Sequence, residues 1–547
     1  MIRLTQIMFH SSLAALLFFA AGIGNVFAQN LIDTAKHPGN PFAERQSVSC
    51  GGINFRWDFE GGSLDSVALV SQGDTLVYDL FSRRDPLNPA DPKLPPSSRW
   101  YLFRMEGTSG KRIKLNIKRS ECRRPFWSLN GVEYERLSAE EAPLGQGYIL
   151  LDCATAHPAD TIYIAYHNPY LASRLNKKIE QWSKLPFVQV SSIGKSYEGR
   201  EMPLLHITEP SDCRKYVVYI HGRIHTSESP ASWHLEKLID LIVANTPHSK
   251  RLREQLDLYI LPFTNPDGVV NGLSRSALHG INLEVNHADP DSLTAVEVKN
   301  IRAFLTELTS KGKAVDLFLN MHSQIADYVT YWIHTAESSS KEAFFNLMKI
   351  ANLTTSQNRL FTKGEFSFSK MHPKYLEGWF WDRFKEKTTA LTFETPYSFY
   401  GRKRGEVADT LWVSERGMEE LAANSYNALG DFFGIESQDR LFAEPKSGGG
   451  ARQLRDKEYL YPGKSYVLAK RNGAKAIYKR SYLDAGKYNL YIWRCNLPGI
   501  CEGDDNAFVK VGTIEQKKNG KFKYKYNKTI KGERLGTALL LPVSSDL

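Results

Sequence analysis

A histidine and a glutamate three residues apart, His225 and Glu228, are of the types and spacing that could hold a metal ion. They follow the apolar run Tyr216 to Ile220, which is short and β-branched as buried strands are, and a helical pattern begins at about Ser229. Imidazole nitrogen and carboxylate oxygen both suit Zn²⁺. Because so short a motif recurs by chance, a surface histidine and a helix-starting glutamate are the alternative.

Two further apolar runs each end at a residue of the same chemical kind. His322 follows Ala314 to Met321, and Glu394 follows Ala390 to Phe393. Ligands bind at the carboxyl ends of the strands in open α/β sheets, so we expect these side chains to meet the first pair there. Glu394 is predicted to be the general base that takes a proton from the attacking water. One Zn²⁺ per chain is predicted, with a ligand set of His225, Glu228 and His322.

These motifs resemble those of the zinc metallocarboxypeptidase family. HGRIHTSE resembles its first zinc motif, NMHSQ its third-ligand segment, and LTFETP the strand of its catalytic glutamate. WDFEGGSLDSV and DTIYIAYHNPYLASRL, which come earlier, are similar to the β-domain of the cytosolic-carboxypeptidase-like branch. The resemblance runs from Asn54 to Gly434. It implies an α/β/α catalytic domain with a mixed sheet, one zinc ion and hydrolysis of a C-terminal peptide bond.

The segment from Thr264 to His287 resembles the one that carries the family's substrate-binding arginine, which corresponds to Arg275. A guanidinium fixed beside the metal would stabilise the charge that develops on the attacked carbonyl. A surface arginine on a loop is the alternative.

The same segment departs from the family at its carboxylate clamp. The family reads Gly-x-Asp-Leu-Asn-Arg, and its last two residues hold the substrate's terminal carboxylate, whereas this chain has Glu284 and Val285. A carboxylate clamp needs a cationic fork, so three alternatives are open: the substrate lacks a free carboxylate there, it presents an ammonium to Glu284, or another basic residue serves as the clamp. Tyr375, which lies 19 residues before the predicted base, is the candidate for the family's substrate-capping tyrosine, ahead of Tyr397.

The first residues have the composition of a secretory signal. Arg3 gives a positive start, and the apolar run Leu13 to Ala21 is too short to span a membrane comfortably. Val26 to Ala28 has the small residues of a cleavage site, so a signal peptide that ends before Gln29 is predicted, with a membrane anchor as the alternative. The chain is therefore expected to be exported, as a periplasmic or secreted protein with no other membrane span.

The chain has 6 cysteines among 547 residues, so it does not depend on disulfides for a core. An oxidising compartment would permit bridges, and Cys495 with Cys501 is the pair we expect.

The remaining pattern predicts three folded parts. Alternating apolar and polar residues with frequent turns indicate a β-sandwich, and alternating strands and helices indicate an α/β domain. The predicted fold class is a zinc-carboxypeptidase-like α/β/α domain with a mixed sheet, preceded by a β-sandwich and followed by a small β-rich domain. The predicted boundaries are signal peptide 1–28, β-sandwich 29–185, catalytic domain 186–436, linker 437–453 and β-rich domain 454–547.

The basic charge lies in the last part. Lys446 to Leu547 holds 21 Lys and Arg against 9 Asp and Glu, which is +12, whereas the whole chain is +10. This part could contact an anionic polymer. The alternative is a strand with one solvent-exposed face, because lysines alternate with aromatic residues from Lys517 to Lys528. Nucleic acid is not expected as a partner.

Three functions remain open from the sequence. The first is a zinc carboxypeptidase that acts on peptide or protein C-termini. The second is an amidohydrolase for modified or cell-wall peptides of the peptidoglycan type, in which the extra amine of a diamino acid meets Glu284. The third is a binding protein that has lost turnover, which the intact Glu394 argues against.

Overall fold

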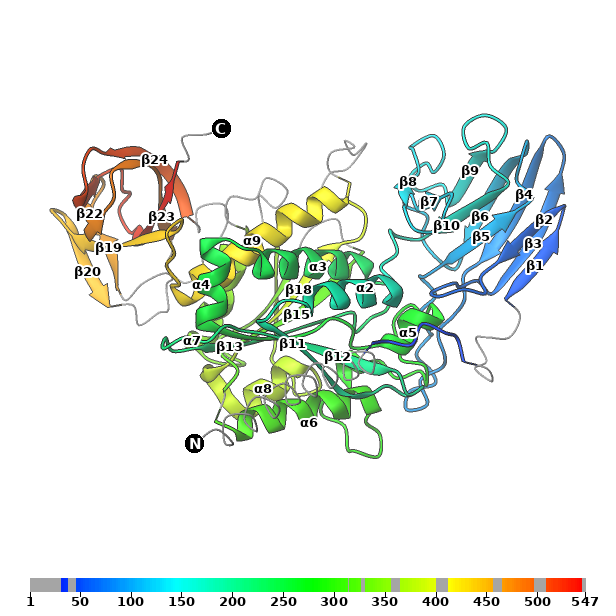
Figure 1. Ribbon diagram of the computed structural model, residues 1–547, viewed down its shortest axis with the longest axis horizontal. Coiled ribbons are helices and arrows are strands. Elements are labelled where there is room, and N and C mark those ends of the chain that lie inside the picture. Colours follow the sequence, from blue (N-terminus) through cyan, green and yellow to red (C-terminus); the bar gives the residue numbers. More distant parts are fainter. Residues whose placement is uncertain are drawn as a thin grey trace, which may run out of the picture.

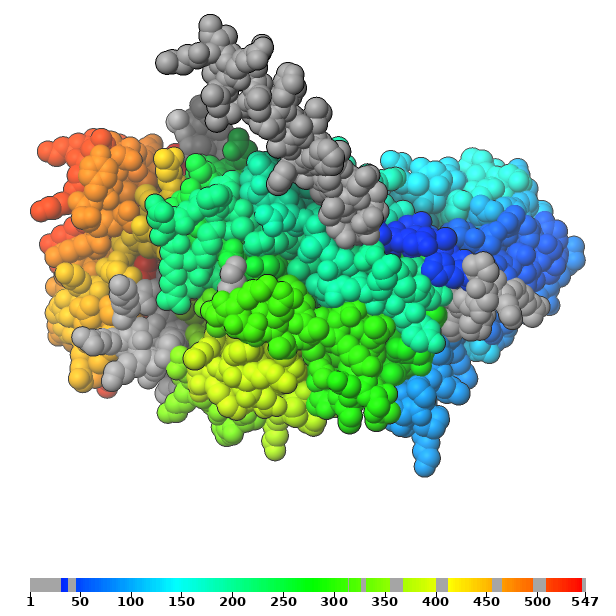
Figure 2. Space-filling model, turned by 60° about the horizontal axis from the view of Figure 1, so that its bottom comes forward, coloured from blue at the N-terminus to red at the C-terminus, as the bar shows by residue number. Residues whose placement is uncertain are grey.

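The computed structural model describes residues 31–37, 46–312, 314–325, 330–355, 365–399, 412–455, 465–495 and 508–543. A β-sandwich lies at one end of the molecule, an α/β domain in the middle and a β-rich unit at the other end (Figure 1). Figure 2 shows the same order from another side. The predicted signal peptide lies outside the described residues. Among the helices of the described ranges, none has the length and apolarity needed to cross a membrane.

The N-terminal part packs two sheets face to face, with strand orders β1-β2-β5-β10-β7-β8 and β3-β4-β6-β9. Every second residue along β4 and β6 is buried, because side chains alternate across a strand and one face of each sheet packs on the other sheet. The strands are β1 (Ser47–Cys50), β2 (Ile53–Arg56), β3 (Ser66–Gln72), β4 (Thr75–Phe81), β5 (Leu102–Glu106), β6 (Arg112–Lys118), β7 (Phe126–Ser128), β8 (Glu135–Arg136), β9 (Tyr148–Asp152) and β10 (Thr161–Ala165).

The central domain is built on a mixed sheet of 8 strands in the order β11-β12-β14-β13-β15-β18-β16-β17. The strands β14, β13, β15 and β18 run parallel, and β11, β12 and β16 join antiparallel partners. The bounds are β11 (Val188–Lys195), β12 (Glu201–Ile207), β13 (Tyr216–Gly222), β14 (Leu256–Leu261), β15 (Leu317–Gln324), β16 (Thr330–His334), β17 (Glu365–Ser369) and β18 (Thr389–Pro396).

Helices cover both faces of this sheet. In β13, Val218 and Ile220 pack in a core with α2, α3, α7 and α9, whereas Val217 and Tyr219 pack in a core with α6 and α8 (Figure 1). The α/β/α prediction is therefore confirmed. The helices of the domain are α2 (Ala172–Trp182), α3 (Ser229–Val243), α4 (Pro247–Gln255), α5 (Pro266–Asn271), α6 (Val296–Ser310), α7 (Lys341–Thr355), α8 (Leu376–Phe384) and α9 (Glu415–Phe433), with the short 3-10 helices η1 (Leu283–Val285) and η2 (Lys385–Lys387).

Three parallel strands, β13, β15 and β18, bring the predicted metal ligands and the predicted base to one edge of the sheet. His225 lies on the loop after β13, and Glu228 is the N-cap residue of α3. His322 and Glu394 lie inside β15 and β18, and the pairing of these strands places them opposite each other. Both strands continue further than expected, because the parallel ladder extends to the pair Gln324 and Pro396.

The C-terminal unit begins earlier than predicted. Residues 437–453 were expected to be a flexible linker, but β19 lies there and β20 begins there, and both pair with strands of the C-terminal sheet. Gly450, with φ +80°, lies in the tight turn between them, which explains the glycine run. The strands are β19 (Leu441–Ser447), β20 (Ala451–Arg455), β21 (Ser465–Ala469), β22 (Ala476–Leu483), β23 (Gly486–Cys495), β24 (Phe508–Gln516), β25 (Gly520–Tyr526) and β26 (Arg534–Pro542).

The basic stretch of this unit includes strand β25, which has one solvent-exposed face. In β25 the lysines are exposed, whereas Phe522 and Tyr526 are buried. The C-terminal sheet also contacts the α/β domain, because Trp493 and Phe508 belong to the same core as α9. An anionic polymer as partner stays a prediction.

A buried histidine makes the stability of the central domain depend on pH. His234 on α3 is 0% exposed, its Nε2 lies 2.9 Å from Ser425 Oγ, and burial lowers its pKa to about 3. The unfolded chain binds this proton below about pH 6.5, so the free energy of unfolding falls as the pH drops below that value. At pH 5 the loss from this group is about 2 kcal/mol relative to pH 8.

Urea unfolding of wild-type protein and of His234→Gln at pH 8 and pH 5 measures this contribution. The difference between the two pH values should be about 2 kcal/mol smaller in the variant. An equal difference in both proteins would show that His234 is not neutral in the folded state.

Candidate active site

The loop after β13 is held rigidly by a buried arginine. Arg223 adopts a left-handed conformation with φ 58°. Its Nε donates to the carbonyl oxygen of Thr226 at 2.7 Å, and its Nη1 donates to that of Tyr170 at 2.9 Å. A non-glycine residue with positive φ is uncommon, and here the hydrogen bonds of the guanidinium hold it. The loop therefore presents His225 in a fixed position.

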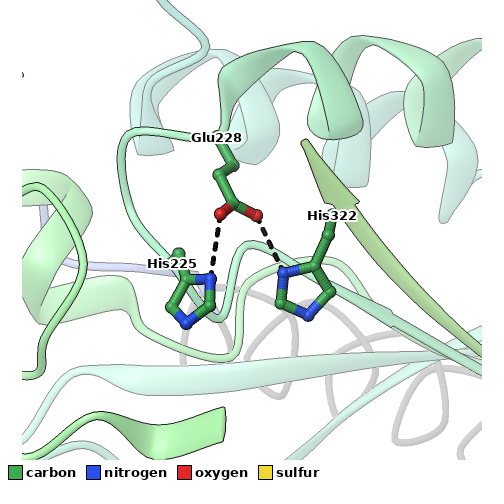
Figure 3. A group of neighbouring side chains, drawn as sticks. All are labelled: His225, Glu228 and His322. Carbon is green, nitrogen blue, oxygen red and sulfur yellow. Dashed lines mark hydrogen bonds and ion pairs between the residues drawn. The ribbon is translucent and has the colours of Figure 1, made fainter. Parts of the chain in front are cut away.

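The three predicted metal ligands form one buried cluster (Figure 3). Glu228 lies between the two histidines: its Oε1 is 2.9 Å from His225 Nδ1, and its Oε2 is 2.9 Å from His322 Nδ1. The candidate ligand atoms all lie within 4.8 Å of one another. Two imidazole nitrogens and a carboxylate are a zinc-type donor set, so these side chains fit the predicted ion.

The far nitrogens of both rings are held by acceptors outside the cluster. His225 Nε2 lies 3.1 Å from Asn282 Oδ1, and His322 Nε2 lies 3.2 Å from Glu284 Oε2. A histidine that donates from one nitrogen presents the other as a lone pair, which is how metal-binding imidazoles are usually oriented. Both Nδ1 atoms are therefore directed at the position where an ion would bind.

The surroundings of the cluster shift the pKa values of its three ligands in different directions. Burial, together with the Arg275 charge, lowers the pKa of His225. Burial opposes ionisation of Glu228, but the two histidines prevail and hold its pKa well below the usual range. For His322, burial is outweighed by the carboxylates of Glu228 and Glu284, which raise its pKa, so metal binding would release a proton there.

Glu394, on the neighbouring strand β18, lines the same cavity as the three cluster residues. Its Oε1 accepts a hydrogen bond of 2.8 Å from Trp332 Nε1, which fixes the carboxylate. Burial raises its pKa above the usual value for glutamate. A carboxylate with a raised pKa is a stronger base than an exposed one, which suits proton transfer near neutral pH.

Arg275 lines this cavity, and the β-sandwich fixes the loop that carries it. The buried carboxylate of Asp85 accepts the backbone N–H groups of Ser274, Arg275 and Ser276 at 2.7, 2.7 and 3.0 Å. The two domains also touch at Gly280, which has φ +87°, and a Cβ there would lie 2.1 Å from the Leu87 carbonyl oxygen. The loop of the sandwich that carries Asp85 and Leu87 thus supports the Arg275 loop.

A cavity of about 560 Å³ joins these groups. It is lined by all the predicted site residues, namely His225, Glu228, Arg275, Glu284, His322, Tyr375 and Glu394. Tyr397 is buried against His167 and Tyr166 and does not line this cavity. Glu284 contacts His322 directly, which the sequence did not indicate. Val285 is not among the lining residues, so the clamp position supplies no group to the cavity.

Asn282, whose Oδ1 contacts the Nε2 atom of His225, should control the affinity for zinc. Asn282→Ala removes the group that orients His225, and loss of such a partner typically weakens metal binding about 10–100-fold. Competition with a zinc chelator measures the dissociation constant. Asn282→Asp keeps an acceptor and should stay within a few-fold of wild type. An unchanged affinity in Asn282→Ala would show that the contact does not orient the ring.

Comparison with known proteins agrees with this geometry. A model of the zinc carboxypeptidase family matches residues 179–417. The chain is 27% identical over 301 residues to cytosolic carboxypeptidase 6 of Mus musculus, covering 50% of this chain and 53% of that protein. It is 28% identical over 318 residues to cytosolic carboxypeptidase 4 of the same organism, covering 49% of this chain and 28% of that protein. The chain thus spans about half the length of these relatives or less.

Solved structures show the same fold. A metallo-carboxypeptidase from Burkholderia cenocepacia superposes with a TM-score of 0.57 at 21% identity, covering 69% of this chain and 98% of that one. A metallo-carboxypeptidase from Pseudomonas aeruginosa gives 0.54 at 20% identity, covering 69% and 97%. Each overlap covers more than two thirds of this chain, whereas the family model matches residues 179–417.

The relatives overturn one prediction from the sequence. They are named cytosolic carboxypeptidases, which contradicts the predicted export to a periplasmic or secreted location, so that prediction is wrong. It depended on Arg3, the apolar run Leu13 to Ala21 and the exit Val26 to Ala28, which together are a compositional signal only.

The predicted disulfide assumed the oxidising compartment of an exported protein. Among the described residues, Cys50, Cys122, Cys153 and Cys213 are free thiols. The predicted Cys495–Cys501 pair lies outside the side chains that the structure describes.

The family uses one zinc ion, and the described residues bring together one matching group of ligands, His225, Glu228 and His322. The motifs, the sheet that positions them and the comparisons agree: residues 179–417 match the zinc carboxypeptidase family, and the chain shares the fold of solved metallo-carboxypeptidases.

Proposed function

We propose that this chain is a zinc-dependent carboxypeptidase that hydrolyses the last peptide bond of a peptide or protein. The observation that carries the proposal is the convergence of the His225–Glu228–His322 cluster with Glu394 and Arg275 on one cavity. Bound to the cluster, zinc would act as a Lewis acid toward water and the scissile carbonyl. The relatives that share half of this chain are named carboxypeptidases, which supports the proposal.

In this proposal the chain's own residues move the protons. Glu394 takes a proton from the attacking water and later delivers it to the leaving amine. Trp332 holds the carboxylate at 2.8 Å so that it stays directed at the cavity. Arg275 donates hydrogen bonds to the oxygen on which negative charge develops, and Asp85 keeps its loop in place.

Product analysis by mass spectrometry tests the proposal. The substrates are matched peptides with a free or an amidated C-terminus and a peptidoglycan stem peptide, each incubated with zinc-loaded protein. We expect stepwise loss of the last residue from the free acid, and no reaction of the amide. Internal cleavage, or cleavage of the amide alone, would contradict carboxypeptidase action, and reaction restricted to the stem peptide would favour the cell-wall amidohydrolase.

A further inference from the structure

One short turn carries the outer hydrogen-bond partners of both metal-binding histidines. The 3-10 helix η1 begins after Asn282, and Glu284 is its middle residue. Asn282 Oδ1 accepts the backbone N–H of Glu284 at 3.1 Å and lies 3.1 Å from His225 Nε2. Glu284 Oε2 in turn lies 3.2 Å from His322 Nε2. The same turn therefore contacts both rings, on the side of each ring that does not face Glu228 (Figure 3).

A buried leucine holds this turn against the metal-binding loop. Leu283, between the two polar residues, is fully buried in a core that includes Ile224 and Val298. Ile224 is the residue before His225, and Val298 lies on α6. Buried apolar contacts of this kind are close-packed and resist displacement, so the turn and the loop keep a fixed relative position. Glu284 is therefore carried by a rigid element.

A chain of buried hydrogen bonds fixes the Glu284 carboxylate. Asn320 Nδ2 donates to Glu284 Oε1 at 3.2 Å and to Thr392 Oγ1 at 3.1 Å. His221 Nε2 lies 2.8 Å from Asn320 Oδ1 and donates to it, because an amide oxygen only accepts. Asn320 and His221 are both fully buried, and every polar atom of the Asn320 amide has a partner. This amide can therefore offer Glu284 a donor only.

The two histidines have outer partners of different charge. His225 contacts the neutral amide of Asn282, whereas His322 contacts a carboxylate. Because that carboxylate accepts, the Nε2 atom of His322 donates, and Nδ1 supplies the lone pair that a metal needs. A carboxylate partner also makes an imidazole a more basic ligand. Glu284 is placed to have both effects on His322.

We propose that Glu284 is a positioning residue of the zinc site, whose carboxylate holds the His322 ring with Nδ1 directed at the ion. Its side chain is only 10% exposed, and both carboxylate oxygens already have donors inside the protein. The position that the family pattern gives to substrate recognition thus serves a metal ligand in this chain, in place of the ammonium contact considered from the sequence. The inference concerns how the ion is held, and it rests on the proposed function for its kinetic consequence alone.

The zinc affinity of Glu284→Gln tests the proposal. Glutamine keeps the volume of the side chain, but its single oxygen cannot accept from His322 and Asn320 together, and its amide nitrogen would face another donor. Competition with a zinc chelator should give a dissociation constant about 10–100-fold above that of wild type. The visible absorption spectrum of Co²⁺-loaded protein should change too, because it reports the geometry of the ligands, which a purely structural role would not alter.

Glu377→Gln is the matched control, since it makes the same change in the same cavity. Glu377 is buried and lines the cavity, and its Oε1 accepts from Thr392 rather than from a metal-binding histidine. Its zinc affinity and cobalt spectrum should match those of wild type. Unchanged zinc affinity in folded Glu284→Gln would overturn the proposal, as would an equal loss of affinity in Glu377→Gln. Thermal unfolding of the metal-free proteins shows whether each variant is folded.

Asn320→Ala decides the question if Glu284→Gln does not fold. It removes the donor that holds Glu284 Oε1 and leaves the carboxylate itself in the protein, so zinc should bind more weakly than in wild type. Wild-type affinity in this variant would then overturn the proposal.

Failure of this proposal can be told apart from failure of the proposed function, because the zinc and cobalt measurements need no substrate. Weaker zinc binding in Glu284→Gln would support the positioning role even if wild type cleaved no peptide. If wild type is a carboxypeptidase and Glu284→Gln loses only the cleavage of peptides that present an ammonium, at unchanged zinc affinity, Glu284 binds substrate and the positioning role is wrong.

Discussion

Replacing Glu394 with glutamine is expected to lower kcat about 10²–10⁴-fold, which is the usual contribution of a positioned general base. Glutamine preserves the shape of the side chain and can still pair with Trp332, so the fold and the zinc content should not change. Steady-state kinetics on a peptide substrate, with metal analysis of the same sample, measures both quantities. The effect should fall on kcat rather than KM, because the lost interaction acts in the transition state.

Glu419→Gln is the control for this experiment. Glu419 is an exposed glutamate on α9 that pairs with Lys237 at 3.2 Å, so its loss should leave kcat unchanged. If Glu394→Gln kept more than about a tenth of wild-type kcat, a general-base role would be untenable, since such a base contributes at least about 10².

Replacing His322 with alanine is expected to remove both zinc and activity. His322 is a buried member of the cluster, and its Nδ1 lies 2.9 Å from Glu228. Loss of an outer partner typically costs about 10–100-fold in metal affinity, and loss of a ligand should cost more. Zinc content after dialysis and kcat/KM of the dialysed protein are the measurements.

His206→Gln is the matched control for this variant. His206 is a half-buried histidine on β12 that stacks on Tyr259, away from the cavity. It should keep one zinc per chain and wild-type activity. Full zinc occupancy in His322→Ala would contradict the assignment of this histidine as a ligand.

The sequence predicted the parts of the site that depend on strand order. His225, Glu228, His322 and Glu394 each follow or end an apolar run, and the sheet brings those runs together as neighbours. The strand ends themselves were predicted too early, because the ladder between β15 and β18 continues past the catalytic pair. Backbone pairing of this kind depends on the neighbouring strand and cannot be read from one apolar run.

Contacts between distant segments were not predictable. Asp85 lies in a Pro-rich loop of the sandwich, and nothing near it in sequence indicates that it binds the Arg275 loop 190 residues away. The role of Glu284 next to His322 likewise follows from the fold. A local signal did exist for Thr392 and Asn320, since each lies two positions before a predicted site residue and therefore shares its face of the strand.

The C-terminal unit shows a different limit. The glycine-rich stretch near Gly450 has the composition of a flexible linker, yet here it turns the chain between β19 and β20. Composition alone does not distinguish a linker from a tight turn, because both use glycine for its backbone freedom. Here the pairing of β19 and β20 with other strands of the unit identifies the stretch as a turn.

Titration of metal-free protein with zinc tests the central claim most directly, with peptidase activity followed at each addition. We expect no activity without metal and a linear rise to full activity at one zinc per chain, with no rise in His322→Ala. Activity in fully metal-free protein, or an endpoint at two zinc ions per chain, would contradict a single catalytic site at His225, Glu228 and His322.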